Sequence, residues 1–194
     1  MNDLTPEGLK SALAGMIARL RECEEELNAL DAELGDGDLG STLVAVAGAV
    51  ESALETLPNN MGASLSRLAE VIGSVSGSSF SSLLMIGLAG ASTAMDGNVL
   101  VSAEDCVQAW RAALAAMREA SGAQLGDKTM LDVVATIVEA PQSAVLKDEI
   151  IRTLDAFRPK PCRAGRARVA ADRSVGRDDP GMIAMLRLVE GASR

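Results

Sequence analysis

The sequence predicts a single all-α domain over residues 1–194, and three observations lead to that prediction. The length is typical of one domain. Hydrophobic residues make up 48% of the chain but aromatic residues only 2%, so the core should consist of Ala, Leu, Val, Ile and Met, most of which favour helices. Apolar residues recur at helical spacing. The alternating Val and Ala of residues 43–50 are read as helix because their neighbours are helical.

The first predicted helix begins at Thr5-Pro6, an N-cap followed by proline at the first helical position. A stripe of apolar side chains at alternating steps of four and three follows: Leu9, Leu13, Met16, Leu20, Cys23, Leu27 and Leu30. Such a stripe faces a core or a neighbouring helix. The helix should end near Leu30, because a loop rich in Gly and Asp comes next.

Seven further helices are expected between turn and capping signals. These signals are Pro58-Asn59-Asn60, Asp96-Gly97-Asn98, a capping box from Ser102 to Asp105, Pro141, and Asp179-Pro180-Gly181. The expected helices cover about 40–57, 62–72, 80–95, 102–120, 130–140, 143–157 and 180–191. The Arg-rich stretch 162–178 should be a loop. The sum is eight helices and no strand.

The distribution of charge excludes some classes of partner. The net charge of −9 argues against a protein that holds nucleic acid by phosphate attraction or docks on an anionic membrane. Residues 22–38 contain eight acids and no base, whereas residues 158–177 contain seven bases and one acid. Residues 71–95 are uncharged, but their apolar part, 83–91, is too short to span a membrane. We therefore expect no nucleic-acid partner and no membrane partner.

The cysteine and histidine content limits the compartment and the chemistry. The three cysteines, Cys23, Cys106 and Cys162, are far apart, which fits reduced thiols in the cytoplasm better than a disulfide framework. The N-terminus lacks the basic start and apolar run of a signal peptide. The absence of histidine excludes an internal Ser-His-Asp triad, histidine-ligated zinc and phosphohistidine. A metal would be held mainly by oxygen, so Mg²⁺, Mn²⁺ or Ca²⁺ is expected.

Three aspartates, Asp31, Asp36 and Asp38, gather in a loop with glycines at 35, 37 and 40. Carboxylates at short range repel one another strongly unless a cation lies among them. The helix start at Gly40-Ser41-Thr42 offers free N–H groups to an anion. An EF-hand is excluded, because Thr42 stands where its twelfth position needs glutamate. By spacing alone the loop is equally a solvated turn or a Mg–phosphate site.

Four segments match, in order, the motifs of one known family. Leu30-Asp31 followed by Gly35-Asp36-Gly37-Asp38-x-Gly40 resembles its metal-binding motif, and Gly73 to Gly77 resembles its GGASG loop. Gly126 to Asp132 resembles its GDKTM(L/V)D signature. Gly165-Arg166-Ala167, Asp172 to Gly176 and Asp179-Pro180-Gly181 resemble its closing GRA…ERS.G…DPG. Together they resemble the DhaL family, the nucleotide-binding subunit or domain of dihydroxyacetone kinases.

The resemblance implies an eight-helix up-and-down antiparallel barrel that binds ATP or ADP with two Mg²⁺ ions. Asp31, Asp36 and Asp38 would be the metal ligands and, with Arg166, the residues that act in catalysis. Nucleotide contacts are implied for Leu39, Gly40, Ser41, Thr42, Ser76, Gly77, Gly122, Met130, Arg166, Asp179, Pro180 and Gly181. The residues alone leave open whether Met130 is plain core and whether Lys128 is a structural cap or catalytic. They also leave open that most of the arginines are simply solvated.

The resemblance also implies a kinase that needs a partner. In that family a separate subunit, DhaK, binds dihydroxyacetone covalently through a histidine, and this chain has none. We therefore expect a DhaK-like sugar-binding subunit that holds a small ketose. The phosphoryl source is either exchanged ATP or an ADP that a phosphotransferase-system phosphocarrier rephosphorylates. A homodimer is also possible.

Three departures from the family pattern leave the aspartates intact. Leu39 replaces the histidine that commonly follows the third aspartate, and Ser78-Ser79-Phe80-Ser81 replaces the end of the usual SGPLYG stretch. The segment between Met130 and Arg166 is shorter than usual. These changes leave the phosphoryl acceptor open. The alternatives to a kinase subunit are a non-catalytic regulatory protein that binds nucleotide and, less consistent with the aspartates, a plain helical interaction domain.

Overall fold

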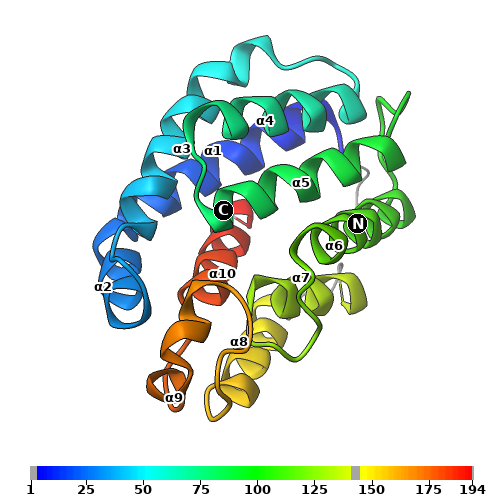
Figure 1. Cartoon of the computed structure of the whole chain (residues 1–194). Coiled ribbons are helices and arrows are strands. Elements are labelled where there is room, and N and C mark those ends of the chain that lie inside the picture. Colours follow the sequence, from blue (N-terminus) through cyan, green and yellow to red (C-terminus); the bar gives the residue numbers. More distant parts are fainter. Residues whose placement is uncertain (1–3, 141–144, 194) are drawn as a thin grey trace.

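A computed structural model describes residues 4–140 and 145–193. Over these ranges the regular elements are all helices, and no β-strand is formed (Figure 1). The α-helices are α1 Pro6–Glu22, α2 Glu24–Leu34, α3 Leu39–Ala53, α4 Met61–Val75, α5 Ser79–Ala94, α6 Ala103–Ser121, α7 Met130–Glu139, α8 Leu146–Phe157, α9 Ala171–Ser174 and α10 Pro180–Ala192. Two short 3-10 helices are η1 Leu54–Thr56 and η2 Arg166–Ala170. One isolated antiparallel bridge joins Leu4 to Val101. The predicted all-α class is confirmed.

The described residues contain ten α-helices where eight were predicted. One extra helix is α9, inside the stretch predicted to be a loop. The other arises because the first predicted helix is two helices, joined at Cys23 with φ −104° and ψ 8°. The N–H of Cys23 is shared between the carbonyls of Arg19 and Leu20, at 3.1 and 3.2 Å. Because Leu20, Cys23 and Leu27 are all buried, the apolar stripe continues through the bend, and the sequence pattern therefore does not reveal it.

Most other predicted boundaries lie within three residues of the observed ones. The capping box is confirmed: the Ser102 side chain accepts from the Asp105 N–H at 3.2 Å, and the Asp105 carboxylate accepts from the Ser102 N–H at 2.9 Å. The end predicted near Leu30 was wrong, since α2 continues to Leu34. Pro141, predicted to stop a helix, and the start of the helix predicted over 143–157 lie outside the described residues.

The helices close into a ring around an apolar centre. Contacts run from α1 to α3, α4, α5, α6, α7, α10 and back to α1, with α8 against α7 and α10. They enclose a cavity of about 390 Å³, whose lining includes Leu13, Val46, Leu68, Leu88 and Met185. The chain has only two Phe, so the core consists mainly of mid-sized side chains, and these do not fill the centre of the ring. The up-and-down order of the expected barrel stays a prediction. No helix among the described residues is long and apolar enough to cross a membrane.

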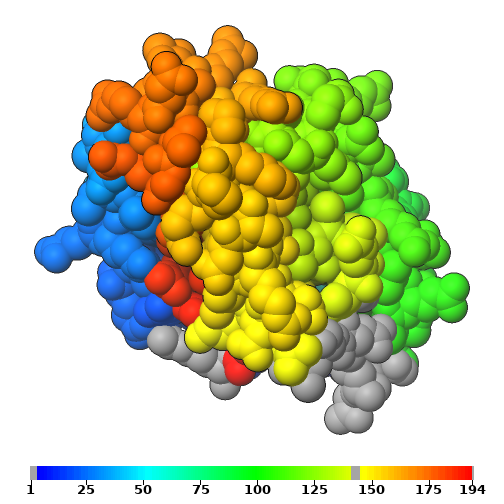
Figure 2. Space-filling view, turned by 90° about the horizontal axis from the view of Figure 1, so that it is seen from below, coloured from blue at the N-terminus to red at the C-terminus, as the bar shows by residue number. Residues whose placement is uncertain are grey.

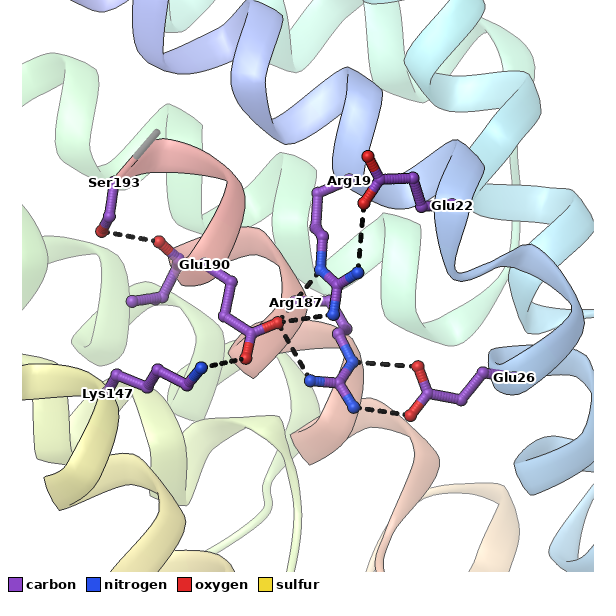
Figure 3. A network of polar contacts seen from close by, with 8 residues as sticks. Arg19, Glu22, Glu26, Lys147, Arg187, Glu190 and Ser193 are labelled. Atoms are coloured by element: carbon purple, nitrogen blue, oxygen red, sulfur yellow. Dashed lines mark hydrogen bonds and ion pairs between the residues drawn. The ribbon is translucent and has the colours of Figure 1, made fainter.

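A network of charged side chains fixes α2 against the other helices (Figure 3). Three cations surround the carboxylate of Glu190 on α10: Arg19, Lys147 and Arg187, at 2.8, 2.9 and 2.9 Å. Arg187 also forms a two-pronged pair with Glu26 of α2, at 2.9 and 2.6 Å. Burial would raise the pKa of Glu190, but the hydrogen bonds from these cations outweigh it and lower the pKa to about 2. The network sets the direction of α2, which leads into the aspartate loop.

Candidate metal centre

The three predicted aspartates come together. One carboxylate oxygen from each of Asp31, Asp36 and Asp38 lies within 4.8 Å of the others. Asp31 is in the last turn of α2, and its Oδ2 accepts the N–H groups of Gly37 and Asp38 at 2.9 and 3.1 Å. Gly37 has φ +79°, the left-handed conformation that glycine adopts without strain. Asp31 therefore shapes the loop that brings the two exposed carboxylates beside its own.

Negative charge is crowded in this loop. The pKa of Asp38 is raised, by desolvation first and then by the charge of Asp36. Desolvation also acts to raise the pKa of Asp36, but its own backbone N–H and the Arg166 guanidinium outweigh it, so that pKa is lowered. Arg166 forms an ion pair with Asp36. The cluster is thus a place where positive charge is favoured, as expected of a cation site.

The start of α3 is held against α2 by contacts that the sequence did not reveal. A side chain at Gly40 would place its Cβ 2.9 Å from Asn28 Oδ1, and even closer to the Glu24 carbonyl, so only glycine fits. The Ser41 N–H donates to Asn28 Oδ1 at 3.1 Å, and the Ser41 hydroxyl donates to Glu24 at 3.0 Å. Leu39, predicted beside the phosphates, is 7% exposed and belongs to the hydrophobic core. Its side chain is therefore core, while the backbone of the first turn remains beside the aspartates.

The Asp179-Pro180-Gly181 turn begins α10 next to two other helix starts. The Asp179 carboxylate accepts the Met182 N–H at 2.9 Å and caps the helix. A Cβ at Gly181 would lie 3.5 Å from Phe80 of α5 and 3.8 Å from Met130 of α7. Burial raises the pKa of Asp179 to about 6, although the Met182 N–H and a nearby lysine oppose the shift. The turn thus connects the predicted second loop with the GDKTM segment.

The remaining predicted contacts have clear local roles. Ser76 ends α4, and its hydroxyl accepts the Ser78 N–H at 3.3 Å; Gly77 beside it is exposed. Gly122 ends α6 with φ +67°, the left-handed cap typical of glycine. Met130 is 3% exposed and lies in the core. Contacts of these residues with a nucleotide stay predictions.

The Arg-rich segment lies on the outer surface of the protein, where its arginines are exposed, and three of them also contact the end of α2 and the aspartate loop (Figure 2). Besides the ion pair of Arg166 with Asp36, Arg173 donates to the Glu33 carbonyl at 2.7 Å, and Arg177 pairs with the Glu33 carboxylate. Leu34 at the end of α2 completes the contact in an apolar cluster with Cys162 and Ala167. The sequence predicted a loop here but not its attachment, because the partners are some 140 residues away.

Comparison with known proteins identifies the family. The DAK2 domain model matches residues 33–194. The chain belongs to the DAK2 domain family. The match includes Asp36, Asp38, Arg166 and the Asp179 turn, and it begins just after Asp31.

Curated relatives of this DAK2 domain are kinases. The chain is 38% identical over 120 residues to dihydroxyacetone kinase of Citrobacter freundii, covering 60% of this chain and 21% of that protein. It is 30% identical over 188 residues to L-erythrulose 1-kinase of Mycolicibacterium smegmatis, covering 86% and 32%. It therefore spans about a fifth to a third of these relatives. It is also 27% identical to the ADP-binding subunit DhaL of the PTS-dependent dihydroxyacetone kinase of Lactococcus lactis, covering 89% of this chain and 88% of that subunit.

Solved structures agree. The native dihydroxyacetone kinase of C. freundii matches 98% of this chain over 35% of its own, with a TM-score of 0.76 and 26% identity. The complex of that kinase with AMP-PNP and Mg²⁺ matches 94% of this chain over 32% of its own, with a TM-score of 0.73 and 27% identity. The predicted resemblance to the DhaL family is confirmed.

Proposed function

We propose that residues 1–194 form one Mg–nucleotide-binding domain, the subunit of a dihydroxyacetone-type kinase that supplies the phosphoryl group to a small ketose held by a DhaK-like partner. The observation that carries the proposal is the convergence of Asp31, Asp36 and Asp38 beside Arg166. Two comparisons support it: the L. lactis relative of nearly equal length is an ADP-binding subunit, and a solved relative holds AMP-PNP and Mg²⁺.

The residues present fit Mg²⁺. Carboxylate oxygens are the ligands that this ion prefers, and it takes the rest of its shell from water and phosphate. Asp31, Asp36 and Asp38 offer such oxygens within 4.8 Å of one another. When bound, two Mg²⁺ ions would offset the negative charge of the phosphates. The chain's own task is to hold the carboxylates together, which the bonds to Asp31 from the loop backbone do in this structure.

Other residues would position the nucleotide, since phosphoryl transfer depends mainly on placement and charge neutralisation. Arg166 would add positive charge beside the phosphates. The first turn of α3, residues 39–42, would offer backbone N–H groups to them. The Ser76-Gly77 loop and the Asp179-Pro180-Gly181 turn would close over the nucleotide. Gly122 and Met130 would border its adenine and ribose side, and Met130 would do so as a core residue.

In this proposal a DhaK-like partner holds the acceptor. The chain has no histidine, so it cannot bind a ketose covalently in the way expected of DhaK. A DhaK-like partner would therefore complete the reaction. Either ATP exchanged at each turnover or a bound ADP rephosphorylated by a phosphocarrier would supply the phosphoryl group.

A second candidate function is a nucleotide-binding regulator that does not catalyse. The observation that favours it is Leu39, an apolar residue directly after Asp38 whose side chain is buried in the core. Transfer of phosphate to a triose or tetrulose, measured with and without a DhaK-type partner, separates the two. Transfer that needs both proteins supports the kinase, and nucleotide binding without transfer supports the regulator.

A thermal-shift titration tests the part that both functions share. We expect Mg–ADP to raise the melting temperature of the wild type, and EDTA to remove the effect. Asp36→Asn should abolish the shift, whereas Asp148→Asn, an exposed carboxylate on α8, should keep it. The absence of any shift in the wild type would exclude both functions.

A further inference from the structure

Lys128 is buried where the C-terminal segment leaves and returns to the body of the protein. Its side chain is 1% exposed, and its Nζ donates three hydrogen bonds to backbone carbonyls. The acceptors are Arg158, Lys160 and Ser174, at 3.1, 2.8 and 2.7 Å. Residues 160–174 are called the closing loop below. One ammonium group therefore joins the two ends of this loop.

The arrangement depends on the charged form of Lys128. Only an ammonium has three N–H donors, so all three carbonyls are satisfied only while Lys128 is protonated. Its backbone has φ +63°, the only positive φ of a non-glycine residue in the described part of the chain. That conformation costs about 1 kcal/mol or more in most residues and persists only where the surroundings enforce it. The three bonds to Nζ are such an enforcement.

Other contacts around Lys128 hold together the two ends of the closing loop, which are called its neck below. The Cys162 N–H donates to the Ser174 hydroxyl at 2.8 Å, which joins the two sides a second time. The Arg163 N–H donates to the carbonyl of Asp127, the residue before Lys128, at 2.9 Å. These bonds place the loop against the GDKTM segment, and the Nζ of Lys128 contacts the backbone at both of its ends.

The middle of the closing loop, away from Lys128, contacts the candidate metal centre and the end of α2. Arg166 pairs with Asp36, and Arg173 donates to the Glu33 carbonyl. Between them, the apolar cluster of Leu34, Cys162 and Ala167 seats the loop on the end of α2. Because Arg166 lies within the closing loop, its position beside Asp36 depends on how the two ends of the loop are held.

We propose that Lys128 is a positioning residue of the nucleotide site, whose ammonium fastens both ends of the closing loop so that Arg166 stands beside the aspartates. The role in binding rests on the proposed function. It differs from a purely structural role, because a structural lysine would change the stability of the protein without changing nucleotide affinity through Arg166.

The first experiment uses the protein without ligand. The side chains of Arg163, Arg166 and Arg168 are already exposed, but trypsin cleaves only where several residues leave their fixed backbone conformation. Loss of the bonds to Lys128 should free the backbone around these three residues. Lys128→Met should speed cleavage after these residues by about tenfold under native conditions. The matched control is Lys160→Met, which removes an exposed charge at the same neck but keeps its backbone carbonyl. Cleavage of Lys128→Met at the wild-type rate would overturn the proposal.

The second experiment is a double-mutant cycle on Mg–ADP affinity with Lys128→Met and Arg166→Ala. If Lys128 acts through Arg166, each change weakens binding by about tenfold and the double variant is only about as weak as either one. Effects that multiply, or unchanged affinity in Lys128→Met, would contradict the proposal. If the wild type does not bind Mg–ADP, the proposed function fails, and the trypsin comparison still decides whether Lys128 holds the loop.

A third variant guards against misfolding. Asn tolerates a positive φ better than most non-glycine residues but has no ammonium, so Lys128→Asn lowers the backbone strain while removing the three bonds. We expect it to fold and to show the same faster cleavage in the closing loop. A Lys128→Asn protein with wild-type cleavage and wild-type Mg–ADP affinity would overturn the proposal.

Discussion

Glu190→Gln should destabilise the protein by an amount that depends on pH. The Glu190 carboxylate is 12% exposed, and three cations contact it. Its pKa is about 2 in the folded protein against an ordinary 4.5. The difference corresponds to about 3 kcal/mol of stability at neutral pH, at roughly 1.4 kcal/mol per pKa unit. Urea denaturation of both proteins at pH 7 measures it.

The pH dependence follows from the direction of the shift. Because the folded pKa is the lower one, the stabilisation is complete above about pH 5 and is lost as the pH falls toward 2. The difference in stability between wild type and Glu190→Gln should narrow from about 3 kcal/mol at pH 7 to about 1 kcal/mol at pH 3. Glu70→Gln, in an exposed pair with Arg67, should cost less than about 1 kcal/mol. Equal effects of the two substitutions, or a gap that is constant with pH, would refute the reasoning.

Two further changes test the site's framework. Gly40→Ala should cost about 1–3 kcal/mol, because the new Cβ meets the Glu24 carbonyl and Asn28; wild-type stability in urea would contradict the close approach of α2 and α3. Asp179→Asn should melt at a higher temperature than wild type at pH 8 and at a similar one at pH 4. Burial raises the pKa of Asp179 to about 6, so its ionisation costs stability as pH rises from 3.8 through 6, and Asn still caps α10. A lower melting temperature at pH 8 would show that the charge is stabilising.

Local signals predicted the helices well, and long-range contacts explain the misses. Caps such as Ser102 with Asp105 act over three residues, so the sequence displays them. The bend at Cys23 has no Pro or Gly to mark it, and the pair that joins α2 to α10 beyond it, Glu26 with Arg187, is 161 residues apart in sequence. A regular apolar stripe is compatible with either one helix or two.

The same distinction applies to the site. The aspartates were predictable because they lie within eight residues, with Asp31 in the last turn of α2 and the other two in the loop that follows. The docking of Arg166 and the burial of Lys128 were not, since their partners are distant in sequence and include backbone carbonyls that carry no sequence signal. Leu39 shows a further limit: a motif position suggested the phosphate side, whereas the start of α3 turns this side chain into the core.

Isothermal titration calorimetry of ADP, with Mg²⁺ and with EDTA, tests the central claim most directly. We predict that the wild type binds ADP with Mg²⁺ and binds it at least about tenfold more weakly in EDTA, as expected when the metal joins the carboxylates to the phosphates. Asp36→Asn should bind weakly in both conditions. ADP binding that is equal with and without Mg²⁺, or unaffected by Asp36→Asn, would contradict a metal centre formed by these aspartates.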